Sequence, residues 1–310
     1  GGNYNVVVGD EAGTAITTGD GLTFVGYAAG SSATTSTDSV GIGEHALDDL
    51  TTGVGNVAIG RYAGGDITTA AGNVAIGSYD GTKQPALRVN TTGAANVAVG
   101  SGSLGANTTA SNNTAVGYAS LAANTTGTAN VAVGKDAMIA NTTGGTNVAM
   151  GADALTANTT GSSNTALGQA SLEANTTASF NTGVGRNALG LNTTGANNTA
   201  LGYNSLVANT TGAYNTALGK SAGGAVTTGT NNTIIGGNTG DALTDADDNV
   251  AVGTSALGTD TLGSKSVAIG ASALHTQNFT SATDTYNTAV GYYAGVAVTT
   301  GVQNTLIGGL

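Results

Sequence analysis

A seventeen-residue repeat constrains this chain more than any other feature. The stretch NTAVGYASLAANTTGTA, from Asn113 to Ala129, is followed directly by NVAVGKDAMIANTTGGT and then by NVAMGADALTANTTGSS. With the first Asn as position one, copies of the repeat begin at residues 5, 22, 39, 56, 73, 96, 113, 130, 147, 164, 181, 198, 215, 232, 249, 266, 287 and 304. Every spacing is 17 except two, which are 23 and 21. A period that persists through the chain predicts one continuous solenoid of about eighteen coils over residues 1–310.

Positions two to five of the repeat predict a short strand that ends at a bend. Position two is β-branched, position three is mostly Ala, position four is aliphatic or Met, and position five is always Gly. The period of two predicts a strand with positions two and four facing the interior and position three on the other face. An unbroken Gly column indicates a positive φ or a close backbone approach. The columns predicted here include Gly100, Gly117, Gly134 and Gly151 at position five, and Val99, Val116 and Val133 at position four.

The second half of the repeat predicts another strand, over positions eight to about fourteen, and then a turn. Where position nine is Leu, as at Leu121, position twelve is usually Asn, as at Asn124; where position nine is Gly, position twelve becomes aliphatic in most copies. This exchange indicates a core of constant volume. Two repeats depart from it, because Leu47 is paired with Leu50 and Gly30 with Ala33. The following NTTG segment is typical of a turn, and stacking would align its Asn and Thr side chains in ladders.

Composition narrows the class of protein. With 18 acidic and 7 basic residues, the chain has a net charge of −11, which disfavours binding to nucleic acid or to anionic lipid. No apolar run is long enough to span a membrane. The sequence lacks an initiator Met and begins and ends within repeats, so we expect it to be a segment of a longer fibre.

The Ala-rich face of the predicted strand suggests self-association. A coil with only small aliphatic residues inside would leave the position-three column uncovered, including Ala58, Ala75, Ala98, Ala115 and Ala132. Packing around a symmetry axis would bury that column. We therefore predict that two further copies of the chain complete a side-by-side homotrimer, with the dimer and the monomer as alternatives.

The stretch NVAVGTSALGTDTLGSKSVAIGASAL, from Asn249 to Leu274, resembles the head repeats of trimeric autotransporter adhesins. The longer form NTALGYNSLVANTTG, from Asn198 to Gly212, is closer in style to the repeats of phage tail fibres. The resemblance covers essentially the whole chain and implies a left-handed parallel β-roll with three chains side by side. Two departures are the longer coil with its NTTG turn, and the absence of a recognisable neck, stalk, anchor or terminal chaperone.

Two insertions are the candidate contact loops, because extra residues should leave the regular surface. They fall near residues 82–90 and 275–286, and the candidate contact residues are Lys83, Arg88, His275 and Phe279. Their partner would be a cell-surface glycan or a protein receptor. Loops that only absorb a coil irregularity are the other interpretation.

No catalytic, cofactor-binding or metal site is predicted. His45 and His275 are the only histidines and lie in distant coils. The acidic stretch from Asp241 to Asp248 could attract a cation, but it lacks the spacing of a calcium loop, and a solvated turn is the default interpretation. A polysaccharide-degrading solenoid would need a positioned carboxylate pair. An ice-binding solenoid would need Thr ladders on a flat strand, whereas the paired Thr residues here are expected in a turn.

These observations together predict an extracellular structural fibre and not an enzyme. The first hypothesis is a phage tail-fibre shaft used in host attachment. The alternative is a bacterial adhesin head or an extracellular biofilm filament on a cell surface.

Overall fold

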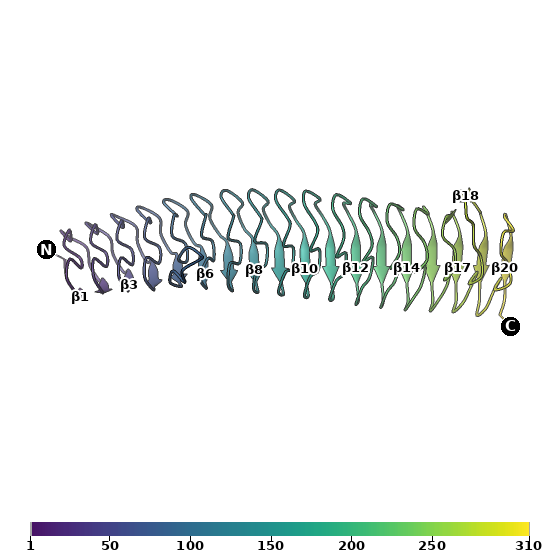
Figure 1. Ribbon diagram of the computed structural model, residues 1–310, viewed down its shortest axis with the longest axis horizontal. Coiled ribbons are helices and arrows are strands. Elements are labelled where there is room, and N and C mark those ends of the chain that lie inside the picture. The colour runs from purple at the N-terminus through teal and green to yellow at the C-terminus, as the bar shows by residue number, and fades with distance from the viewer. Residues whose placement is uncertain (1, 310) are drawn as a thin grey trace. The chain divides into compact units, whose positions relative to one another are not determined.

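The computed structural model describes residues 2–309, and all regular elements within this range are β-strands (Figure 1). The chain forms two compact units, which adjoin in the sequence at Thr160 and Gly161. The strands of the first unit each occupy positions two to four of a repeat: β1 Val6–Val8, β2 Thr23–Val25, β3 Val40–Ile42, β4 Val57–Ile59, β5 Val74–Ile76, β6 Val97–Val99, β7 Thr114–Val116, β8 Val131–Val133 and β9 Val148–Met150.

The second unit repeats the same arrangement and adds one pair of two-residue strands near the second insertion. Its strands are β10 Thr165–Leu167, β11 Thr182–Val184, β12 Thr199–Leu201, β13 Thr216–Leu218, β14 Thr233–Ile235, β15 Val250–Val252, β16 Gly263–Ser264, β17 Val267–Ile269, β18 Thr283–Asp284, β19 Thr288–Val290 and β20 Thr305–Ile307.

Within each unit, the three-residue strands of consecutive coils pair in parallel and in register. Ala115 of β7 lies opposite Ala132 of β8, one repeat further on. The register is kept across both insertions, where β5 pairs with β6 and β17 pairs with β19. These pairings confirm the predicted all-β fold, a parallel β-solenoid with coils of about 17 residues. That the two units form one continuous, left-handed solenoid stays a prediction.

The alanine at position three points into the coil, so the predicted orientation of the strand was wrong. The residues expected on an uncovered face are completely buried: Ala58, Ala75, Ala98, Ala115 and Ala132. The reason lies across the coil. At Gly64, an added Cβ would lie 3.2 Å from Leu47 Cδ2 and 3.7 Å from the Cβ of Ala58, so positions three and nine share one interior. A leucine from position nine fills that space and leaves room for only a methyl group at position three.

Positions two and four consequently face outward. Val99, Val116 and Val133 are only partly buried, and Ile59 and Met150 at the same position are 38% and 45% exposed. Each unit therefore presents columns of β-branched and aliphatic side chains on the outer surface of its sheet.

Positions six to eleven form turns in place of the predicted second strand. Ala119 and Leu121 both have φ of 53°, the left-handed conformation that L-residues usually avoid. Their N–H groups point along the stack in opposite directions: Ala119 donates to the Ser101 carbonyl of the preceding coil, and Leu121 to the Ala137 carbonyl of the following one. Hydrogen bonds between coils are thus made without extended backbone, which the strand-like pattern of the sequence did not indicate.

The exchange between positions nine and twelve does maintain the core volume. Ile67 at position twelve is buried and fills the space beside Gly64. One of the two departures is explained by position three. Phe24 is fully buried, and its ring occupies the space that a side chain at Gly30 would need. Position three of the next repeat is Gly41, where an added Cβ would lie 3.0 Å from Phe24 Cδ1, so this glycine also accommodates the ring.

Two ladders of buried asparagines run through the turns. At position twelve, Asn124 Nδ2 donates to Asn107 Oδ1 (3.0 Å) and to the Gly127 carbonyl (2.9 Å). At position one, the Asn130 backbone N–H donates to Asn113 Oδ1 (3.0 Å). The amides thus satisfy buried backbone groups, which would otherwise be costly. The threonines behave differently, because their hydroxyls donate to a backbone carbonyl of the next coil and not to one another.

The exchange gives a double-mutant test. Leu121→Gly alone should cost about 3 kcal/mol through a cavity, and Asn124→Ile alone about 2 kcal/mol through the broken ladder. In the double variant the new isoleucine fills the cavity. Its loss of stability should therefore be about 1–2 kcal/mol smaller than the sum of the losses in the two single variants. Urea denaturation of the four proteins measures this coupling, and simple additivity would refute the shared-volume explanation.

Candidate functional site

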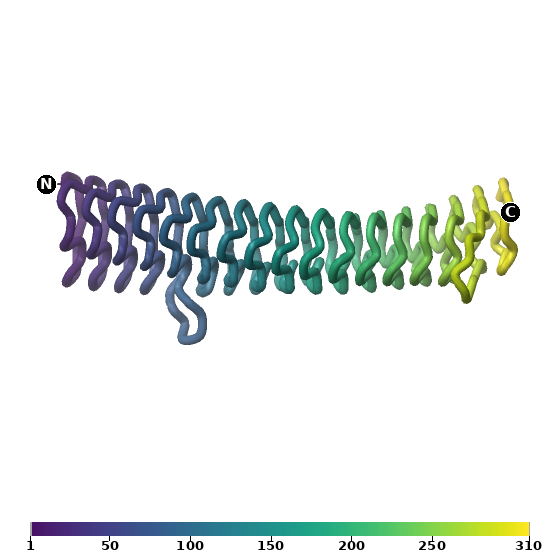
Figure 2. Tube along the Cα trace, turned by 90° about the horizontal axis from the view of Figure 1, so that it is seen from above, coloured from purple at the N-terminus to yellow at the C-terminus, as the bar shows by residue number. Residues whose placement is uncertain are grey.

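The first insertion leaves the coil as a projecting loop, residues 78–83 (Figure 2). The repeat is regular up to Gly77 and resumes at Gln84, whose carbonyl accepts a hydrogen bond from Gly102 in the next coil (2.7 Å). The extra residues therefore lie earlier than the predicted range 82–90, most of which belongs to the coil itself.

Asp80 holds this loop together. Its Oδ1 accepts hydrogen bonds from the backbone N–H of Lys83 (2.8 Å), and from the N–H (2.8 Å) and hydroxyl (2.9 Å) of Thr82. The hydrogen bond from the Lys83 N–H, and after it those from Thr82, favour the ionised form of Asp80. They therefore lower the pKa of Asp80 to about 2. The Tyr79 hydroxyl also donates to the Gly81 carbonyl (3.0 Å). The loop is thus stabilised by its own residues.

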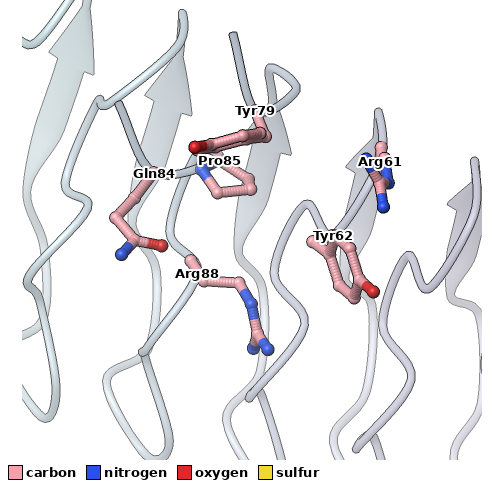
Figure 3. A pocket seen from close by; sticks show the side chains of 6 residues that line it. All are labelled: Arg61, Tyr62, Tyr79, Gln84, Pro85 and Arg88. Carbon is pink, nitrogen blue, oxygen red and sulfur yellow. The ribbon is translucent and has the colours of Figure 1, made fainter. Parts of the chain in front are cut away.

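A pocket of about 340 Å³ lies beside the loop and is called the loop pocket below. Its volume lies within the range of about 300–1,000 Å³ that is usual for small-molecule sites. In Figure 3, Tyr79 lies next to Pro85, and the guanidinium of Arg88 extends toward Tyr62. The lining contains two arginines and no carboxylate: it consists of Arg61, Tyr62, Tyr79, Gln84, Pro85 and Arg88.

Coil stacking places aromatic rings behind this pocket. His45 and Tyr62 both occupy position seven, in consecutive coils. Their rings are parallel, with an angle of 2° and 4.7 Å between centroids, which matches the spacing of neighbouring strands. The rings of Tyr27 and His45 are nearly perpendicular, with 5.3 Å between their centroids. The next residue in the position-seven column is Pro85, so the pocket lies at the end of an aromatic stack.

Both arginines contact the Tyr62 ring. The Cζ atoms of Arg61 and Arg88 are 5.1 and 5.3 Å from its centroid, within cation–π range. Each also pairs with a carboxylate outside the pocket lining: Arg61 Nε lies 3.2 Å from Glu44, and Arg88 contacts Asp66. The arginines are therefore positioned both by charge and by the aromatic ring.

Gly65 makes room for Arg88. An added Cβ at Gly65 would lie 2.7 Å from Arg88 Nη1 and 3.1 Å from Asp48 Oδ1. The Asp48 carboxylate lies 3.1 Å from His45 Nδ1. Burial raises the pKa of Asp48, and the nearby charge of Asp49 adds to that effect. The missing side chain at position ten thus allows an arginine from one coil to reach toward the preceding one.

Of the predicted contact residues, Arg88 lines the loop pocket. Lys83 lines a second hollow of about 200 Å³ on the loop's other side, with Gln84 and Gly102. Arg61 and Tyr62 also line the pocket, although they were not among the predicted contact residues because they belong to the regular coil before the insertion. Bulky residues occupy positions six and seven in the coils directly before the 23-residue repeat. This run is the signal in the sequence that could have indicated Arg61 and Tyr62.

The second insertion is built differently. Phe279 is only 7% exposed, and His275 Nδ1 lies 3.0 Å from the Ser255 carbonyl. Beneath them, buried Gln277 Nε2 donates to the buried Asp260 carboxylate (2.6 Å), which also accepts a bond from the Phe279 N–H (3.1 Å). Neither predicted contact residue lines one of the pockets described above. Gln277 and Phe279 therefore take part in an internal hydrogen-bond network, whereas residues 280–282 are exposed.

The acidic stretch from Asp241 to Asp248 is spread over contacts between coils. Asp245 accepts a hydrogen bond from Thr228, and Asp247 Oδ1 accepts bonds from the N–H (2.6 Å) and hydroxyl (2.9 Å) of Thr230. Within residues 2–309, no three His, Cys, Asp or Glu side chains gather in a group that could hold a metal ion.

The same range contains no helix that could cross a membrane. Compared with known proteins, the sequence matches no protein-family model and no curated protein.

Proposed function

We propose that the chain is a shaft segment of an extracellular homotrimeric fibre, as in a phage tail fibre that holds a host-binding tip away from the virion. A bacterial adhesin head or a biofilm filament is the alternative within the same structural class. The observation that supports the proposal is the outward strand surface of each unit, where aliphatic columns lie on a coil whose own interior is already filled.

The outward columns replace the alanine column as the proposed contact between chains. Ile42 and Ile59 in the first unit are each 38% exposed, and Leu201 and Leu218 in the second are 44% and 42% exposed. Contiguous exposed apolar surface of this kind typically marks an interaction site. Three copies related by a symmetry axis would each cover the columns of a neighbour, and closed symmetry would limit the assembly to a defined size.

Charge on this surface should separate the chains. We expect Ile42→Glu/Ile59→Glu to convert a trimer into monomers, because each assembly would have to bury several unpaired carboxylates. Thr52→Glu, at an exposed turn of the same coil, is the matched control and should stay trimeric. Analytical ultracentrifugation gives the mass, and circular dichroism checks that the β-structure is kept. A monomeric unmodified chain at high concentration would refute the trimer.

Immunoelectron microscopy distinguishes a phage tail fibre from a bacterial adhesin or biofilm filament as the source of the chain. An antibody raised against the purified chain should decorate the tail fibres of phage particles if the shaft proposal is right. Labelling confined to the outer surface of bacterial cells or to biofilm matrix would favour the alternative.

A further inference from the structure

We infer that the loop pocket binds an acidic sugar unit of a polysaccharide. The inference deepens the proposed function and rests on it only for the source of the sugar, a surface polysaccharide. The chemistry of the ligand follows from the pocket itself.

The apolar part of the lining suits the faces of a sugar ring. Tyr79 and Pro85 offer ring surfaces, on which the C–H groups of a pyranose can pack while its hydroxyls remain free for hydrogen bonds. The Tyr62 ring is stacked on His45 and contacts the two arginines, so it serves to position them. Tyr79 is 50% exposed, so much of its ring is open to a ligand. The Gln84 amide both donates and accepts, as a ring with several hydroxyls requires. A pocket with few polar groups set among rings is typical of small-molecule recognition.

The charge of the lining selects an acidic ligand. The chain has only 7 Lys and Arg against 18 Asp and Glu, yet Arg61, Lys83 and Arg88 lie within a few coils of one another at this loop. A guanidinium has five N–H donors, so the contacts of Arg61 with Glu44 and of Arg88 with Asp66 leave donors for a further carboxylate. The overall negative charge opposes a polyanion such as nucleic acid. A short oligosaccharide with one carboxylate on each sugar ring presents a single carboxylate to the pocket and satisfies both conditions.

The loop is organised before a ligand arrives. Asp80 fixes the backbone at Thr82 and Lys83, and the Thr82 hydroxyl lies 3.3 Å from the Tyr118 hydroxyl of a later coil. Less conformational entropy is then lost on binding. A single site of this size would bind weakly, and repetition of the site in a multimer would raise the avidity.

The test uses the full chain with trigalacturonic acid as the acidic probe and maltotriose as the neutral probe, measured by titration calorimetry and saturation-transfer NMR. We expect the acid to bind at least about tenfold more tightly than maltotriose, and more weakly as salt is raised, because exposed charges are screened. Arg61→Gln and Tyr79→Ala should each weaken binding by about tenfold or more. Arg186→Gln and Tyr203→Ala are the matched controls, since these exposed side chains occupy position six in other coils, and they should leave binding unchanged.

Several outcomes would overturn the inference: equal binding of the two sugars, equal binding of triglutamate, no binding of the acid at all, or full binding by Arg61→Gln. Failure of the two proposals can be told apart. A monomer that binds the acidic sugar removes the trimeric fibre and leaves the pocket, whereas a trimer that does not bind it removes only the pocket.

Discussion

Replacing Gly134 with valine is expected to destabilise the coils around it by about 3–5 kcal/mol. Two effects combine at this position. Gly134 has φ of 135°, a conformation nearly restricted to glycine. An added Cβ would also lie 2.5 Å from the Gly151 carbonyl oxygen and 2.6 Å from its carbon, closer than van der Waals contact permits. The obstacle is backbone of the next coil, so it cannot move aside as a flexible side chain could.

Gly308 has φ of 130°, close to that of Gly134, but no atom lies within 4 Å of an added Cβ, so Gly308→Ala gives the cost of this conformation without the close approach. Gly55 has φ of 68° and likewise no atom within 4 Å, so Gly55→Ala should cost only about 1 kcal/mol. Gly134→Ala should cost clearly more. Lys135→Ala should change stability by less than about 0.5 kcal/mol, because its ion pair with Asp136 lies at an exposed position.

Urea denaturation gives the overall effect, and hydrogen exchange should locate the loss of protection in the coils nearest residue 134. If Gly134→Ala and Gly308→Ala proved equally destabilising, close approach of the coils would not be the reason for the glycine column.

The spacing of the repeat was sufficient to predict coils that pair in parallel, because a stacked coil meets a near copy of itself. The direction in which the strand faces was not predictable from the same letters. A three-residue strand such as VAV alternates equally well with either face inward. The choice depends on how wide the coil is and on what crosses it, and here buried Leu121 from position nine fills the interior.

The loop pocket shows a similar limit. The insertion indicated Arg88. Tyr62 and Arg61 belong to the preceding coil, and they lie beside Arg88 only because the coils stack and because Gly65 leaves space for the Arg88 side chain. The turn at positions seven and nine was also hidden, since neither Ala119 nor Leu121 is a residue type that usually indicates a left-handed backbone.

Removing one rung of the position-one asparagine ladder should also have a large effect. Asn215 is completely buried. Its Oδ1 accepts hydrogen bonds from the backbone N–H and Nδ2 of Asn232 (both 3.0 Å), and its Nδ2 donates to the Gly229 carbonyl (2.8 Å). Asn215→Ala would leave these groups without that partner in a dry interior. We expect a loss of about 2–4 kcal/mol in the free energy of unfolding, measured by urea denaturation.

Asn215→Asp makes the same site sensitive to pH. At pH 7 the variant must bury a carboxylate whose second oxygen faces the Gly229 carbonyl, so a loss of at least about 3 kcal/mol is expected. Burial should raise the folded-state pKa of this aspartate above its unfolded value of about 3.9. Between those two values the folded chain holds a proton that the unfolded chain has released, so stability falls as pH rises through the folded-state pKa.

Lowering the pH from 7 to 4 should therefore restore part of the stability of Asn215→Asp relative to the unmodified chain, because the protonated acid can again donate to the Gly229 carbonyl. Asn197→Asp is the matched control, since it adds the same charge at an exposed position where an aspartate tolerates the φ of 60°. Its stability relative to the unmodified chain should hardly depend on pH. If the two variants showed the same pH profile, the buried amide ladder would not be what fixes one coil on the next, and the packing of the aliphatic core would have to supply that specificity.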